Sequence, residues 1–600
     1  MEMAVLKKNS LHAIGIFFSP IKKMPVFFVF LFILGLLCLC IEQPLEGMPP
    51  AYKYRFIELF TDLYIICLVL SFIPRKIRMW IQIIVCIILY SVAIADVFCY
   101  DRFDSYLTPT MLQLAKETNK NETEEFFGSY ISLKTFLSPI GIIILLSIIH
   151  IFVSIKKCGG LLINKSVKYQ PFWGAVILAL LIYGCIVCYP NKSKLHKLMS
   201  QTNTSEMERM WNKRYGDGLY LPIYRLTFSL YANHLTEKQV DNLLANIDKV
   251  QVDSCTFKSP NIVLIIGESY NKHHSQLYGY EKPTTPRQLR RAQRGDLTVF
   301  TDVIAPWNLT SEVFKNSFSM YGFGDKGTWS DYPLFTELFR KAGYHVTFLT
   351  NQFVMNPDEK PADFSGGFFL NNKALSNAQF NTRNDESHRY DDGLLEDYDL
   401  LKRYHTNHNL IIFHLIGQHV GYGNRYPADR QKFGKKDYIR PDLNDKELGI
   451  LSDYDNATLY NDSIVDEIIK RFEKQNAIVI YMPDHGEEVF DDIHIFGRMH
   501  SARLTARMVR QEFEIPFWIW CSHSYIIGNP DIFKEILSAR NRPFMTDNIA
   551  QLLVFLGGIS CPDYKPGNNP ISPVYNTKRE RLLKSTNVNY DSLMSQNHGI

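Results

Sequence analysis

Residues 477–488 read AIVIYMPDHGEE, and the fold class follows from this stretch more than from any other. The run from Ala477 to Met482 is almost continuously apolar and rich in β-branched residues, which is typical of a strand buried on both faces of a parallel sheet. Asp484 and His485 follow the strand directly. Because ligands bind at the carboxyl ends of strands in open α/β sheets, the sequence predicts a site here.

A second stretch with the same pattern, NIVLIIGES at 261–269, lies earlier in the chain. It predicts a buried strand over Asn261–Ile266 that ends on Glu268. One carboxylate from this strand and the Asp484-His485 pair from the other make an O,O,N ligand set. Such a set suits Zn²⁺ with a fourth position left for a reacting group.

Further apolar runs alternate with helical patterns after residue 256. His345–Leu349 and Asn409–Leu415 read as strands, whereas Pro333–Ala342 and Ser452–Gln475 read as helices. This alternation predicts that residues 256–600 form an α/β domain with a mostly parallel central sheet.

The first 190 residues have a different character, and we predict an α-helical transmembrane domain there. A bilayer span needs about 20 apolar residues. The sequence offers five such stretches, at Met24–Ile41, Phe56–Ile73, Met79–Val97, Phe136–Ile155 and Pro171–Pro190. The second contains Glu58 and Asp62, which suit either the outer interface or a polar cleft.

Lysine and arginine clusters predict the orientation of these five spans. They precede the first span, connect the second to the third, and connect the fourth to the fifth, so all three fall on one side. An odd number of spans then places everything after Pro190 on the opposite face, which in a bacterium is the periplasm or the cell exterior. We expect a multi-pass protein of the bacterial inner membrane with residues 256–600 in the periplasm. Residues 191–255 read as an interfacial linker. The small net charge of +4 argues against nucleic acid as a partner.

Thr310 is the candidate nucleophile, because it lies between the two ligand strands in APWNLTSEVF (305–314) and precedes a predicted helix. Backbone N–H groups at a helix N-terminus stabilise phosphoryl oxygens, and a nearby metal activates a hydroxyl. The local sequence by itself favours Thr310 as a simple N-cap. Ser269, next to Glu268, is the rival nucleophile.

Six motifs in order resemble the phosphoethanolamine transferases of the alkaline phosphatase superfamily, which modify lipid A and lipopolysaccharide core. They are GES…QLYGY (267–280), NLTSE (308–312), HLIGQH…RYP (414–427), YDNATLYND (454–462), PDHGEE (483–488) and EIPFWIW (514–520). The resemblance covers the whole chain and implies five membrane helices before a sulfatase-like domain.

The resemblance also implies roles for single residues. Glu268, Asp484 and His485 match zinc ligands, and Thr310 matches a nucleophile that also contacts the metal. His419 matches a histidine that binds substrate phosphate and transfers protons. His500 matches a second pocket histidine. Glu514 stands where the family often has a third one, which puts a second metal in doubt and leaves a carboxylate for the donor's ammonium.

The function implied is zinc-dependent transfer of phosphoethanolamine from phosphatidylethanolamine to lipid A or lipopolysaccharide core. Lower affinity of the envelope for cationic antimicrobial peptides would follow. The alternatives are a phosphoglycerol transferase of the lipoteichoic-acid type, a sulfatase-like phosphodiesterase, and a non-catalytic binding protein. For His273 and His274 the sequence favours a solvated loop over a metal role.

Overall fold

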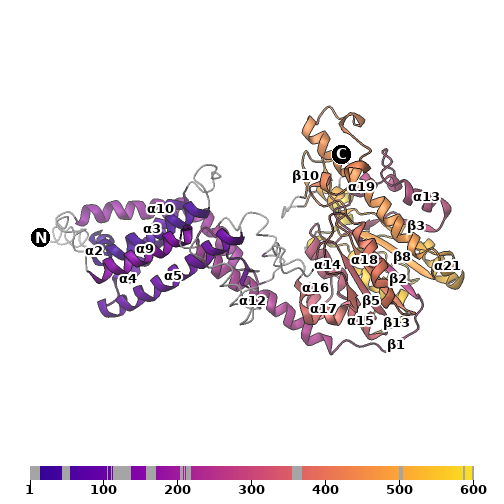
Figure 1. Cartoon of the computed structure of the whole chain (residues 1–600), viewed down its shortest axis with the longest axis horizontal. Coiled ribbons are helices and arrows are strands. Elements are labelled where there is room, and N and C mark those ends of the chain that lie inside the picture. Colours follow the sequence, from indigo (N-terminus) through magenta and orange to yellow (C-terminus); the bar gives the residue numbers. More distant parts are fainter. Residues whose placement is uncertain are drawn as a thin grey trace. The chain divides into compact units, whose positions relative to one another are not determined.

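The computed structural model describes residues 14–42, 54–103, 106–109, 111–112, 137–156, 170–202, 207, 210, 218–354, 368–498, 504–585 and 588–596. These residues divide into two compact units, with the boundary between Thr236 and Glu237 (Figure 1). The first unit is helical, and the second contains the sheet.

Apolar helices form at all five predicted membrane segments of the first unit. They are α3 (Pro25–Glu42), α4 (Arg55–Ser71), α5 (Arg75–Phe103), α9 (Pro139–Ile155) and α10 (Gln170–Met199), and the short α2 (Ser19–Lys23) precedes α3. Leucines and cysteines of α3 and α4 pack together in its core with residues of α5 and α9.

Only some of these helices are long and apolar enough to cross a bilayer. Within the described residues, Arg75–Asp101 and Gln170–Met199 qualify. A third span is added if Ile16–Lys23 and Pro25–Ile41, which meet at a bend of 85°, count as one. Helix α9 is apolar but has 17 residues. The described helices therefore give two to three candidate spans, and the count of five stays a prediction.

Buried polar contacts join these helices to the first half of α12 (Pro222–Ile247). Asp96 on α5 forms an ion pair with Arg225 on α12, with Oδ2 and Nη2 2.5 Å apart. Asp62 accepts hydrogen bonds from Lys192 and from the Tyr220 and Tyr224 hydroxyls at 2.6–2.7 Å. The carboxylates on α4 thus lie in a polar cluster, which offsets the cost of burying them.

The second unit is built on a seven-stranded sheet with the order β3-β11-β8-β2-β7-β5-β6. The strands are β2 (Asn261–Gly267), β3 (Leu297–Phe300), β5 (His345–Thr350), β6 (Thr382–Arg383), β7 (Asn409–His414), β8 (Ala477–Pro483) and β11 (Phe517–Cys521). Strands β8, β2, β7, β5 and β6 are mutually parallel, and β11 pairs antiparallel with β8 and β3. The mostly parallel sheet and its four predicted strands are therefore confirmed.

Side chains of β2 alternate between two cores, because successive residues of a strand point to opposite faces. Ile262, Leu264 and Ile266 pack with helices on one face, and Val263 and Ile265 pack on the other. The first face is covered by α14 (Thr310–Phe318), α15 (Phe335–Lys341), α22 (Pro530–Ala539) and α23 (Ile549–Gly557). The second is covered by α13 (Pro286–Arg294), α18 (Gly393–Leu401) and α19 (Asp445–Phe472).

The register of the sheet determines where its functional residues lie. Strands β2 and β8 are neighbours, and Gly267 at the end of β2 pairs with Pro483 at the end of β8. The residues that follow each strand therefore emerge side by side at the same edge of the sheet.

Candidate functional site

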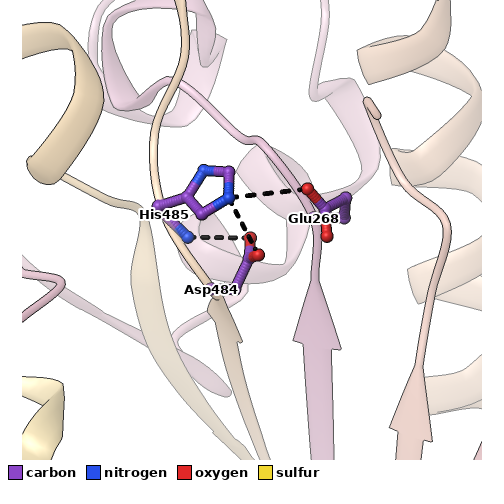
Figure 2. Close-up of side chains that lie close together, drawn as sticks. All are labelled: Glu268, Asp484 and His485. Atoms are coloured by element: carbon purple, nitrogen blue, oxygen red, sulfur yellow. Dashed lines mark hydrogen bonds and ion pairs between the residues drawn. The ribbon is translucent and has the colours of Figure 1, made fainter. Parts of the chain in front are cut away.

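Glu268, Asp484 and His485 converge at this edge of the sheet (Figure 2). All three are fully buried, and one ligand atom from each lies within 4.8 Å of the others. His485 Nε2 is 3.0 Å from Asp484 Oδ2 and 3.6 Å from Glu268 Oε1. The three side chains that the sequence predicted as ligands therefore lie together.

The protonation of His485 leaves a lone pair directed at the two carboxylates. Its Nδ1 lies 2.8 Å from the Gly486 carbonyl oxygen, so Nδ1 carries the proton and Nε2 does not. Burial and the charge of Arg498 lower the pKa of this imidazole to about 3. Asp484 Oδ2 is buried and accepts no hydrogen bond from any described residue. The two carboxylates and the imidazole Nε2 face one another, and Asp484 Oδ2 lacks a donor among the described residues, so this donor set fits a zinc ion.

The backbone around Glu268 is arranged to hold its carboxylate. Ser269 has a positive φ of 53°, and its N–H donates to Asp484 Oδ1 at 3.0 Å. Its hydroxyl donates to Glu268 Oε1 at 2.7 Å. A Cβ on Gly417 would lie 2.9 Å from the Glu268 nitrogen, so the loop after β7 approaches closely only because residue 417 is glycine. A strained residue fixed by two contacts holds the ligand in one orientation.

Thr310 lies against this cluster. Its Oγ1 is 3.2 Å from Glu268 Oε2 and 3.3 Å from His485 Nε2. The simple N-cap interpretation is wrong, because helix α14 begins at Thr310 and its N-cap is Leu309. The hydroxyl is therefore directed at the ligand cluster from the first turn of a helix.

Several functional contacts come from residues that the sequence did not single out. Gln352 donates to Glu268 Oε2 at 3.1 Å. Arg498 places Nη1 2.5 Å from His485 Nε2 and Nε 3.3 Å from Glu487 Oε2. Burial raises the pKa of Glu487 to about 8, even though Arg498 opposes the shift. Arg498 thus lies close to three buried carboxyl groups, those of Glu268, Asp484 and Glu487.

Two relatives are similar to the chain over nearly its whole length. Phosphoethanolamine transferase EptC from Escherichia coli strain K12 is 26% identical over 555 residues, covering 89% of this chain and 90% of that protein. Phosphoethanolamine transferase CptA from Salmonella typhimurium strain LT2 is 27% identical over 559 residues with the same coverage. The resemblance of the chain to the phosphoethanolamine transferase family is therefore confirmed over nearly its whole length.

Two further comparisons concern the second unit of the chain. The sulfatase family model matches residues 260–525. The crystal structure of the C-terminal periplasmic domain of EptC from Escherichia coli, in complex with zinc, is 27% identical. The match between the two structures covers 58% of this chain and 96% of that domain, with a TM-score of 0.49.

The other residues that the resemblance singled out have separate positions. His419 is half-buried after β7, and Arg425 donates to its Nδ1 at 3.3 Å. Glu514 accepts from the Tyr590 hydroxyl at 2.8 Å and lies 3.2 Å from His273 Nε2. Burial raises the pKa of Glu514, but the contacts with His273 and Lys272 outweigh it and the net pKa is lowered. His500 lies outside the described residues.

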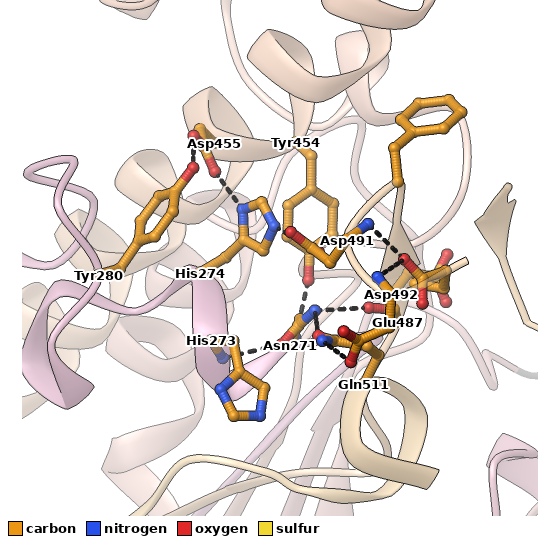
Figure 3. A network of polar contacts seen from close by, with 12 residues as sticks. Asn271, His273, His274, Tyr280, Tyr454, Asp455, Glu487, Asp491, Asp492 and Gln511 are labelled. Carbon is orange, nitrogen blue, oxygen red and sulfur yellow. Dashed lines mark hydrogen bonds and ion pairs between the residues drawn. The ribbon is translucent and has the colours of Figure 1, made fainter. Parts of the chain in front are cut away.

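A polar network behind the ligands corrects the expectation of a solvated loop at His274 (Figure 3). His274 is 1% exposed. Its Nδ1 lies 2.7 Å from Asp455 on α19, and its Nε2 lies 3.0 Å from Asp491. Asn271 donates to the Glu487 carbonyl and to Gln511, each at 2.8 Å. These contacts tie the loop after Glu268 to the loop after His485.

Proposed function

We propose that this chain transfers phosphoethanolamine from phosphatidylethanolamine to lipid A or lipopolysaccharide core, with a covalent intermediate on Thr310. One observation carries the proposal: the Thr310 oxygen lies 3.2–3.3 Å from two members of the Glu268, Asp484 and His485 cluster. The two relatives that match nearly the whole chain are named phosphoethanolamine transferases. Both lines of support point to the same reaction.

Glu268, Asp484 and His485 would hold the zinc ion, with Thr310 at its open side. When bound, zinc supplies a Lewis acid that lowers the pKa of a neighbouring hydroxyl and offsets charge on phosphoryl oxygens. The donor set of two carboxylates and one imidazole matches the preferences of this ion. Ser269 and Gln352 keep the Glu268 carboxylate oriented through hydrogen bonds to its two oxygens.

The chemistry is two successive displacements at phosphorus. The Thr310 oxygen attacks the donor phosphorus and the bond to the glycerol oxygen breaks, so diacylglycerol leaves with a proton. Glu268 Oε2 accepts the hydrogen bond of the Thr310 hydroxyl and is placed to take its proton. An acceptor phosphate or hydroxyl oxygen then attacks the intermediate, and Thr310 regains its proton.

His419 and Arg498 are placed to bind phosphoryl oxygens. A guanidinium only donates, so the Arg425 contact leaves His419 Nδ1 as the acceptor and the proton on Nε2. His419 then offers an N–H to a phosphoryl oxygen, and Arg498 offers a guanidinium beside the ligand cluster. A guanidinium and an N–H donor at these positions stabilise the negative charge that spreads over the equatorial oxygens of the transferred phosphoryl group.

The membrane anchor fits a lipid donor. We infer that all five helices span the inner membrane and that the catalytic unit lies in the periplasm, as the lysine and arginine clusters predict. An anchored enzyme meets phosphatidylethanolamine in the outer leaflet of that membrane. Each transferred group adds an ammonium to the envelope, which lowers its affinity for cationic peptides.

Mass spectrometry of envelope lipids and polysaccharide tests the proposal. Bacteria that carry the wild-type chain are compared with bacteria that carry Thr310→Ala, at matched protein levels. The account predicts phosphoethanolamine on lipid A or core only with the wild-type chain. Phosphoglycerol in its place would favour the lipoteichoic-acid type of transferase, and loss of phosphate or sulfate groups would favour a hydrolase.

A further inference from the structure

A basic groove on the catalytic unit has no role in the chemistry described above. It encloses ≈370 Å³ and is lined by residues of α13, α19 and the segment 429–432. Its cations are Arg287, Arg290, Arg430 and Lys432, against the single carboxylate of Asp429. A volume of this size holds a small ligand, such as one or two sugar rings.

Most of this positive charge is free to meet a ligand. Arg287 is held by the buried Asp462, with Nη1 and Oδ2 3.3 Å apart. Among the described residues Arg430 forms an ion pair with Asp429 alone, with Nε and Oδ2 3.9 Å apart, and both side chains are more than half exposed. Arg290 has no hydrogen bond or ion pair among the residues that the structure describes. An exposed ion pair such as Arg430–Asp429 contributes little free energy. The groove therefore carries a net positive charge.

The arrangement suits phosphate groups attached to sugar. Arg287 and Arg290 are three residues apart on α13 and thus share one face of the helix. Guanidinium groups bind phosphate through paired hydrogen bonds. Pro286, Leu459 and Tyr460 add apolar surface to the lining of the groove, which matches the apolar faces of sugar rings.

The loop that contributes residues to the groove also carries a residue of the active site. Arg430 and Lys432 lie on the segment after β7 that carries His419. This segment is fixed to α19, because Tyr426 donates to Asp453 at 2.8 Å and the Lys432 N–H donates to Asn456 at 2.7 Å. One rigidly held loop therefore carries both a proposed phosphoryl-binding histidine and part of the groove.

We propose that this groove binds the phosphate groups of a phosphorylated envelope saccharide and so holds the acceptor. The inference rests on the proposed function, since it names a subsite for that acceptor. Phosphorylated core oligosaccharide and the phosphorylated disaccharide of lipid A share the chemistry that the groove recognises. The saccharide of these two that binds more tightly is identified as the acceptor.

A pair of charge-matched triple variants tests this assignment. The groove variant is Arg290→Ala/Arg430→Ala/Lys432→Ala. The control is Arg294→Ala/Lys402→Ala/Lys578→Ala, which removes three exposed cations outside the groove. Both are made in the full chain in detergent micelles, and thermal unfolding verifies that each is folded.

Equilibrium binding is measured without donor, with both saccharides, with their dephosphorylated forms and with phosphatidylglycerol vesicles. We expect the groove variant to bind at least one phosphorylated saccharide about 10-fold more weakly than wild type, and the control to match wild type. Dephosphorylation and high salt should weaken wild-type binding.

The proposal is overturned if the two triple variants bind alike, if dephosphorylation has no effect, or if the groove variant loses only vesicle binding. Because no transfer takes place in this assay, binding is judged even if the chain proves not to transfer phosphoethanolamine. In a transfer assay the groove variant should raise the acceptor KM and keep kcat, as expected for a residue that binds and does not react.

Discussion

His274 gives a sharp test of the network behind the ligand cluster. Both ring nitrogens face carboxylates, at 2.7 Å from Asp455 and 3.0 Å from Asp491. Both can donate only if the ring is an imidazolium. Although burial opposes it, these two carboxylates raise the pKa of His274 to about 10, from an ordinary value of about 6.5.

The folded pKa lies above the unfolded one, so protonated His274 stabilises the fold fully below about pH 6.5. This stabilisation is lost as the pH rises through about 10, where the folded protein releases the proton. The difference between the folded and unfolded pKa values corresponds to a stabilisation of the fold of about 4 kcal/mol at pH 7 and about 0.4 kcal/mol at pH 10. No reduction for solvent screening is needed, because the side chain is 1% exposed.

His274→Gln removes the charge and keeps one hydrogen-bonding amide. At about 2 °C per kcal/mol for a large domain, its Tm should fall about 8 °C below wild type at pH 7. The difference should narrow to about 1 °C at pH 10, because about half of the folded wild-type molecules have then released the proton and most of the stabilisation is lost. The measurement is thermal unfolding of the full chain in detergent micelles, followed by tryptophan fluorescence.

His494→Gln is the matched control. His494 contacts Glu447 at 3.1 Å, but its side chain is 58% exposed. A surface pair contributes less than about 1 kcal/mol, so this Tm should stay within about 2 °C of wild type. A His274→Gln difference that does not narrow between pH 7 and pH 10 would refute the assignment of a buried imidazolium.

Three further predictions concern the site and the membrane topology. Asp484→Asn keeps the shape but removes a charge, so zinc measured by elemental analysis should be lost and transfer should fall by about 10²-fold or more; full activity in a metal-free preparation contradicts this. Arg498→Gln should keep zinc and lower kcat by about 10²-fold, because a donor to the phosphoryl oxygens is removed; an unchanged kcat excludes that role. A reporter that is active only in the cytoplasm should be silent when fused after Ile600, and strong activity would overturn the five-span topology.

The sheet and the ligand cluster were predictable for a physical reason. Strands buried on both faces are continuous apolar runs, and the residue after each run leaves the sheet at a known edge. This located Glu268, Asp484 and His485. Strand β11 was harder, because its residues formed a recognisable motif without indicating that the strand runs antiparallel to β8.

Contacts that depend on distant parts of the chain were not predictable. His274 is buried because Asp455 on α19 and Asp491 on another loop close over it. Arg498 reaches His485 from a loop with no periodic pattern. Neither a hydrophobic period nor a motif spacing reports such contacts, since both describe neighbours in sequence. Helices form at all five predicted segments, but apolarity by itself did not determine how many of these helices are long enough to span a bilayer.

Covalent modification of the protein tests most directly whether Thr310 carries the transferred group. Purified full-length chain is incubated with phosphatidylethanolamine, zinc and no acceptor, and its intact mass and peptide map are measured. The account predicts a mass increase of one phosphoethanolamine group, located on the peptide that contains Thr310 and absent from Thr310→Ala. A label on Ser269, or equal labelling of a folded Thr310→Ala protein, would contradict it.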